Sequence, residues 1–124
     1  MEVTDRYAMK GERSGRPDFS SLLSYGNEAS MLDKLTTETE KEMQALRDAK
    51  CRNDLEGLNA LTHHLRSSWE ILRADQPLKV LYRLLHGEGT PDNEALFHAV
   101  NGVLEKGAEI IRLAKEERRK YGQG

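Results

Sequence analysis

The sequence predicts an all-α protein, and three observations support this fold class. Leucine and alanine, which favour helices, occur 17 and 10 times, whereas valine and isoleucine, which favour strands, occur four and three times. Apolar residues recur every three or four positions along most of the chain. Four long helical segments are separated by short connections. We therefore expect an antiparallel four-helix bundle with a short extra N-terminal helix.

The 124 residues suffice for one domain of ordinary size, and composition divides them into three regions. Residues 1–17 combine glycine, proline and mixed charges without a periodic apolar pattern, so we expect a linker or flexible tail there. The helical pattern occupies residues 18–121, which predicts the bundle domain. Residues 122–124 are expected to form a short C-terminal tail.

The bundle begins with a short helix and a long one. Asp18 is a suitable N-terminal cap for a short helix that ends near Gly26. A longer helix is expected to start at Gly26 or Asn27. Its apolar stripe has seven positions at helical spacing: Met31, Leu32, Leu35, Thr39, Met43, Leu46 and Ala49.

A third helix is expected to start at a cap provided by Asn53 or Asp54 and to reach about Arg73. Its apolar positions are separated by three or four residues and fall within an arc of about 120°, which predicts one buried face. These positions are Leu55, Leu58, Leu61, Leu65, Trp69 and Leu72.

Two further helices complete the expected bundle. Asp75 is predicted to cap the fourth helix, with Pro77 in its first turn and apolar positions at Leu78, Leu81, Tyr82 and Leu85. A loop follows, and Thr90 is the expected cap before Pro91. The last helix should run from about Asp92 to Lys120. Its apolar positions are Leu96, Phe97, Val100, Val103, Leu104, Ile110, Ile111 and Ala114.

Composition argues against several functional classes. The 19 lysines and arginines are outnumbered by 21 aspartates and glutamates, which argues against nucleic-acid binding. No apolar run approaches the roughly 20 residues needed for direct membrane insertion. The single cysteine, Cys51, excludes an internal disulfide and favours a reducing, cytoplasmic setting. The charged outer faces of the helices favour a monomer.

The third helix carries a histidine that points away from the apolar stripe. His63 lies about 145° from the centre of that stripe, whereas His64 lies about 115° from it. His63 is therefore expected to face water. Arg66, three residues later, can place its guanidinium beside a phosphoryl group attached to His63. Neutral imidazole is the form of histidine that attacks phosphorus.

These residues resemble the signature of the histidine-containing phosphotransfer domain of bacterial phosphorelays. The family pattern is histidine, any residue, leucine, lysine or arginine, glycine and serine. It corresponds here to His63-His64-Leu65-Arg66-Ser67-Ser68. The acidic lead-in at residues 53–58 is also similar, and the family fold is a four-helix bundle with a small N-terminal helix. Ser67 departs from the pattern, because the family commonly has glycine there.

The resemblance implies a phosphorelay carrier and not an autonomous enzyme. His63 would accept a phosphoryl group from a receiver-domain aspartate and pass it to another receiver or back, while Arg66 offsets its charge. No cofactor or metal is expected in this domain, because magnesium belongs to the receiver. The residues around His63 that would dock the receiver are Asn59, Ala60, Ser67 and Glu70.

The implied partners are response-regulator receiver domains and the chain's own hybrid sensor kinase. In the second case the domain would be the cytoplasmic part of a membrane-bound kinase, with residues 1–17 as linker. In the family, residues of the following helix often face the histidine. The candidates for this position are Tyr82, Arg83 and His86.

Three alternatives remain open. The chain is a helical adaptor or scaffold if His63 is incidental. A motif shifted by one residue would make His64 the acceptor, although the angles and the Leu-Arg spacing favour His63. With His63 as the acceptor, His64 is a boundary residue near a neighbouring helix. A metal-binding bundle is disfavoured, because adjacent histidines point about 100° apart on a helix.

Overall fold

The structure is a computed structural model that describes residues 16–122, and all its regular elements are helical. The all-α prediction is confirmed for these residues. The expected tail at 1–17 lies outside the described residues except for Arg16 and Pro17, as do residues 123 and 124. The elements are α2 (Ser20–Leu23), α3 (Glu28–Cys51), α4 (Leu55–Ile71), α5 (Gln76–Leu85), α6 (Asn93–Arg118) and a 3₁₀ turn, η1 (Arg119–Tyr121).

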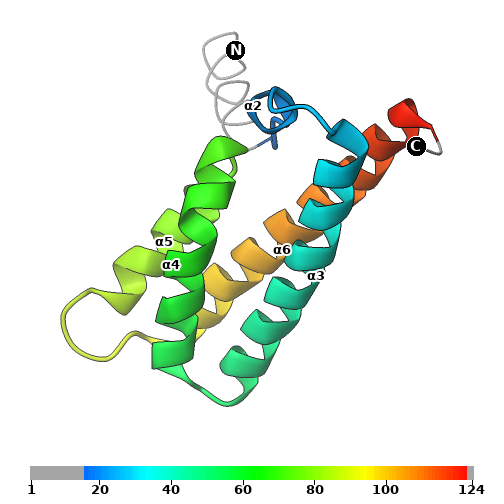
Figure 1. The fold of residues 1–124 in the computed structure, drawn as a ribbon. Helices are drawn as coiled ribbons and strands as arrows, with labels where there is room; N and C mark the ends of the chain where they lie inside the picture. The colour runs from blue at the N-terminus through cyan, green and yellow to red at the C-terminus, as the bar shows by residue number, and fades with distance from the viewer. Residues whose placement is uncertain (1–15, 123–124) are drawn as a thin grey trace, which may run out of the picture.

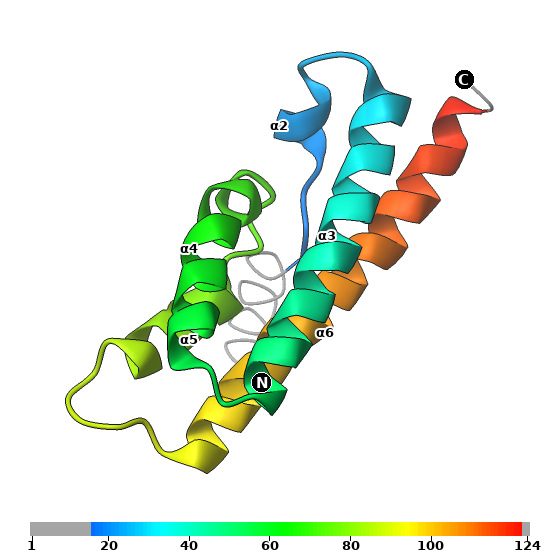
Figure 2. The same ribbon diagram turned by 60° about the horizontal axis from the view of Figure 1, so that its bottom comes forward.

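The four longer helices form a closed ring of contacts in which successive helices run in opposite directions (Figure 1). Helix α3 packs on α4 and α6, and α5 packs on the same two helices. Near the start of α3, Asp33 accepts a hydrogen bond from Arg118 at the end of α6. Near the end of α3, Lys50 donates to Asn101 in the first half of α6. These two pairs establish the antiparallel course of α3 and α6, which lie side by side in Figure 2 as well.

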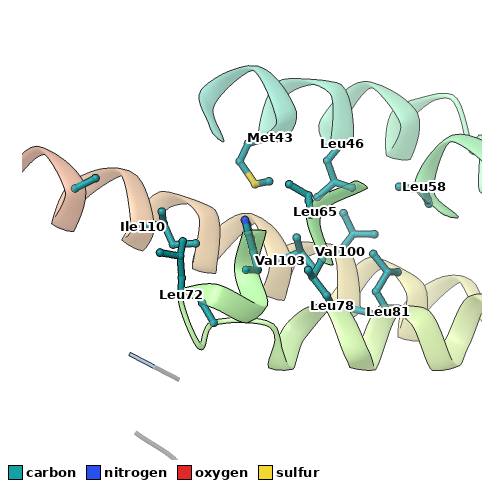
Figure 3. Close-up of a cluster of buried hydrophobic side chains, with 14 of the residues drawn as sticks. Met43, Leu46, Leu58, Leu65, Leu72, Leu78, Leu81, Val100, Val103 and Ile110 are labelled. Carbon is teal, nitrogen blue, oxygen red and sulfur yellow. The ribbon is translucent and has the colours of Figure 1, made fainter. Parts of the chain in front are cut away.

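Apolar side chains from all four helices meet in one core (Figure 3). Burying one leucine-sized side chain contributes about 1.5–3 kcal/mol, so this core stabilises helices that would be marginal in isolation. The labelled members are Met43, Leu46, Leu58, Leu65, Leu72, Leu78, Leu81, Val100, Val103 and Ile110.

Aspartate side chains cap the two helices α4 and α6. The Asp54 carboxylate accepts from the Gly57 N–H at 2.9 Å, in agreement with the predicted start of α4. The Asp92 carboxylate accepts from the Ala95 N–H at 3.0 Å. The prediction that Thr90 caps the last helix is therefore wrong, because the extended backbone of Asp92 places its side chain over the first free N–H groups.

One apolar residue of α6, Phe97, is not buried. Its ring is 50% exposed, and the Lys50 ammonium lies 4.0 Å from the ring centroid. On this turn of α6, the buried residues are Leu96, Ala99 and Val100. Phe97 follows Leu96 by about 100° around the helix and therefore faces the edge of the core. Phe97, one of the apolar positions expected on this helix, is therefore not part of the core.

The segment before α2 is attached to the end of α4. The Asp18 N–H donates to the Leu72 carbonyl at 2.8 Å, and Phe19 is buried. The Asp18 carboxylate accepts from the Ser20 N–H, and this hydrogen bond lowers the pKa of Asp18. The turn into α3 uses the left-handed backbone of Gly26 and Asn27.

Candidate functional site

Helix α4 has one buried face and one exposed face. Leu58, Leu65 and Trp69 are each 1% exposed and face the core. His63 and Arg66 lie on the opposite side and are exposed, as the helical spacing predicts. The middle of α4 therefore presents an imidazole to solvent on a helix whose rotation is set by its buried face.

His63 and Arg66 border a groove between α4 and α5 with a volume of about 290 Å³. Two of its lining residues, Thr62 and Leu78, are buried, Asp75 is half-buried, and the other five are exposed. We refer to it as the α4–α5 groove. It is lined by Thr62, His63, Arg66, Asp75, Leu78, Lys79, Tyr82 and Arg83.

Two of the three cationic side chains in the groove are engaged by carboxylates. Arg66 Nε donates to Glu70 Oε2 at 3.2 Å, one turn further along α4. Lys79 Nζ lies 3.7 Å from Asp75 Oδ2, one turn earlier. Arg83 has no ion-pair or hydrogen-bond partner within residues 16–122. The groove is therefore a site of net positive charge that can attract an oxyanion.

A polar and aromatic contact chain joins α4 to α5 beside His63. Asn59 Oδ1 and His86 Nε2 are 2.8 Å apart. The His86 ring stacks on Tyr82 with a centroid separation of 4.1 Å, and Arg66 Cζ lies 6.0 Å from the Tyr82 centroid. These contacts hold the outer edges of the two helices together and fix which α5 residues lie next to the histidine.

The other predicted docking residues lie on the same surface of α4. Ala60 and Ser67, one turn before and one turn after His63, are both exposed. Their small side chains leave room for another protein surface to approach the imidazole. Asn59 is half-buried through its contact with His86, and Glu70 is exposed and paired with Arg66. The structure thus brings all four predicted docking residues onto the face that carries His63.

His64 contacts the neighbouring helix α3, as expected for a boundary residue. Its Nε2 lies 2.8 Å from Glu42 Oε2, although the histidine side chain is 66% exposed. Burial raises the pKa of the Glu42 carboxyl, and the hydrogen bond with His64 opposes this change. His64 therefore joins α3 to α4 and lies outside the α4–α5 groove.

Four of the eight lining residues were not predicted as site residues: Thr62, Asp75, Leu78 and Lys79. Thr62 is buried, and its hydroxyl donates to the Leu58 carbonyl at 2.8 Å, which satisfies it within the helix. Lys79 lies one turn before Arg83 on α5. The i, i+3 and i+4 spacing of residues 75, 79, 82 and 83 was the available signal. This spacing identifies groove residues only when the packing of α5 against α4 is known.

The described part of the chain contains no group of three or more metal-ligating side chains. Cys51 is exposed and forms no disulfide. None of the helices within residues 16–122 combines the length and apolar character that crossing a membrane requires.

No protein-family model, curated protein or solved structure matches this chain. Its function is therefore inferred from the exposed histidine and the groove beside it.

Proposed function

We propose that this chain is a histidine phosphotransfer carrier in a phosphorelay. The observation that carries the proposal is the exposed imidazole of His63 in the middle of α4, at the edge of a groove with net positive charge. The ring of α3, α4, α5 and α6 is, in this proposal, the antiparallel four-helix bundle of such carriers, with α2 as the extra N-terminal helix. The resemblance of residues 63–68 to the family signature points the same way.

The reaction transfers a phosphoryl group from an aspartyl phosphate of a receiver domain. A ring nitrogen of neutral His63 attacks the phosphorus in line. The new P–N bond forms as the P–O bond to the aspartate breaks, and the aspartate leaves as a carboxylate. The other ring nitrogen keeps its proton during the attack. The transfer to a second receiver follows the same path in reverse.

The residues around His63 have separate parts in this proposal. Arg66 offsets negative charge on the transferred group, since guanidinium groups form strong charge-assisted hydrogen bonds with phosphate. Ala60 and Ser67 leave room for the receiver, while Asn59 and Glu70 border the contact surface. Magnesium and most catalytic groups are supplied by the receiver, so the chain is a substrate and carrier that works in the cytoplasm or in the cytoplasmic part of a sensor kinase.

The direct test incubates the chain with a receiver domain labelled on its aspartate with radioactive phosphate. Acid-labile, base-stable label should appear on the wild type, disappear in His63→Gln and persist in the matched control His64→Gln. The opposite pattern in the two variants would move the acceptor to His64. A wild type that takes no label from several receivers would contradict the proposal and favour a helical adaptor.

A further inference from the structure

The three cationic side chains of the α4–α5 groove differ in whether a nearby carboxylate already neutralises their charge. The Arg66 guanidinium binds Glu70, and the Lys79 ammonium lies near Asp75. Arg83 makes no ion pair with any carboxylate of residues 16–122. The sequence motif draws attention to Arg66, but Arg83 is the groove cation whose charge no carboxylate of the described residues compensates.

Arg83 belongs to the same face of α5 as the other groove residues. It follows Lys79 by four positions, which places the two side chains one above the other on the helix. Arg83 and His63 border the same groove, one from each helix. A group attached to the imidazole and directed into the groove therefore lies between α4 and α5, where a side chain from α5 can reach it.

The lining of the groove leaves few other donors for such a group. Leu78 is apolar and 2% exposed, and the Thr62 hydroxyl already donates to the Leu58 carbonyl. The buried apolar side chain of Leu78 lowers the local dielectric on its side of the groove and strengthens the attraction between a guanidinium and an anion there. The remaining candidates are the cationic side chains and the Tyr82 hydroxyl.

We propose that Arg83 is the principal counter-charge for the phosphoryl group on His63, and that the α4–α5 groove is the subsite for this tetrahedral oxyanion. This inference rests on the proposed phosphotransfer function. A phosphoryl group on a side chain carries a charge of about −1.5 to −2 at neutral pH, more than one cation neutralises. Arg83 can neutralise the first part of this charge without breaking an ion pair within residues 16–122. Arg66 contributes after it leaves Glu70.

The test uses the whole chain and phosphoramidate, a small phosphoryl donor that needs no receiver. The His63 imidazole displaces ammonia from phosphorus, forming one P–N bond as another breaks. The initial rate of phosphohistidine formation is followed by ³¹P NMR. This donor separates the chemistry at the groove from docking of a receiver protein.

Arg83→Gln should lower the initial rate about tenfold, the size expected from losing one charge-assisted hydrogen bond. Arg83→Lys should recover part of the rate, because it keeps the charge. The matched control is Arg112→Gln, which removes an exposed, ion-paired arginine on α6, away from the groove. It should react at the wild-type rate, and circular dichroism should show the same helical content for all three variants.

Glu70→Gln tests the second half of the proposal, because it releases Arg66. Introduced into the Arg83→Gln chain, it should raise the phosphorylation rate severalfold. The absence of any rise would overturn the role assigned to the Arg66–Glu70 pair.

Different results would overturn the role of Arg83 and the carrier function. A wild type that reacts at His63, with Arg83→Gln reacting at the same rate, would overturn the role of Arg83 and leave the carrier function intact. A wild type that forms no phosphohistidine at His63 with phosphoramidate or with a phosphorylated receiver would overturn both.

Discussion

The α3–α6 pair and the α4–α5 pair are both antiparallel, but they are held together differently. Helices α3 and α6 have 24 and 26 residues, against 17 and 10 for α4 and α5. The two polar pairs described above, Asp33–Arg118 and Lys50–Asn101, bridge the long helices near the two ends of α3. A third pair lies between them, with Lys115 Nζ 3.6 Å from Glu40 Oε2. Gly107 of α6 faces the Met43 thioether, and a Cβ there would overlap it.

The shorter pair instead leaves a groove with cationic side chains at its surface. We infer that the long pair mainly stabilises the fold, whereas the short pair carries the candidate site. The long helices supply an extended interface, whereas the short helices supply an edge where most of the charged groove side chains are exposed. Substitutions in the first pair should change folding, and substitutions in the second should change phosphotransfer.

The largest effect on stability should come from a truncation in α6. Ile110 is fully buried, so Ile110→Ala should lower the free energy of unfolding by about 2–5 kcal/mol in urea denaturation. The folded fraction should still form phosphohistidine at the wild-type rate. The control Lys79→Gln, in the α4–α5 groove, should stay within about 0.5 kcal/mol of wild type, as exposed sites usually do. Equal losses in the two variants would remove the distinction between the pairs.

At Arg66 the expected change is in phosphotransfer and not in folding. Arg66→Ala should slow transfer from a phosphorylated receiver about tenfold, because one charge-assisted contact is lost. Arg66→Lys should lose less, since the charge is retained. Thermal unfolding should hardly change in either variant, because the pair with Glu70 is exposed. Equal losses of transfer in the two variants would indicate a geometric role for the guanidinium.

The helix caps should behave alike in the two regions. Asp54→Ala at the start of α4 and Asp92→Ala at the start of α6 each remove a side chain that accepts a backbone hydrogen bond. Each should cost about 1 kcal/mol of unfolding free energy, and the asparagine variants should retain most of it. An alanine variant as stable as wild type would show that its cap makes no contribution.

The smallest effect concerns pH and the α3–α4 contact. The pKa of Glu42 is raised in the folded chain by burial, so folding favours the protonated carboxyl. The contribution of Glu42 to stability is fully present below the pKa of this carboxyl in the unfolded chain. It is lost as the pH rises through the pKa of the carboxyl in the folded chain. Glu42→Gln has no carboxyl at this position, so it does not show this loss of stability. Urea unfolding from pH 4 to 7 should therefore show the wild type losing stability relative to the variant, and the reverse trend would contradict the sign.

Much of the fold was predictable because it follows from helical periodicity. The apolar spacing that begins at Leu55 placed α4 and directed His63 away from the core, and Asp54 marked the start of the helix. Errors occurred where local signals competed. Thr90 and Asp92 are both good caps, and backbone conformation decided between them. Phe97 is apolar, but it lies about 100° around the helix from the buried Leu96 and faces the edge of the core.

The candidate site was predictable on α4 alone. The sequence placed His63, Arg66 and the small residues around them on one helical face, because all of them belong to a single segment with a fixed repeat. It left open which of Tyr82, Arg83 and His86 lies near the histidine. Their position depends on a turn in which Arg73 has left-handed backbone, and on the packing of α5 against two other helices.

The sequence by itself thus determined the helices, their buried faces and the exposed histidine, since these depend on contacts within a few residues along the chain. Only the tertiary structure decided the composition of the α4–α5 groove and the pairing of its cations. The relative register of two helices is set by side-chain packing between them, and no local repeat encodes it. The exposed histidine is a property of α4, whereas the place of Arg83 in the same groove, without an ion pair among residues 16–122, is a property of the tertiary structure.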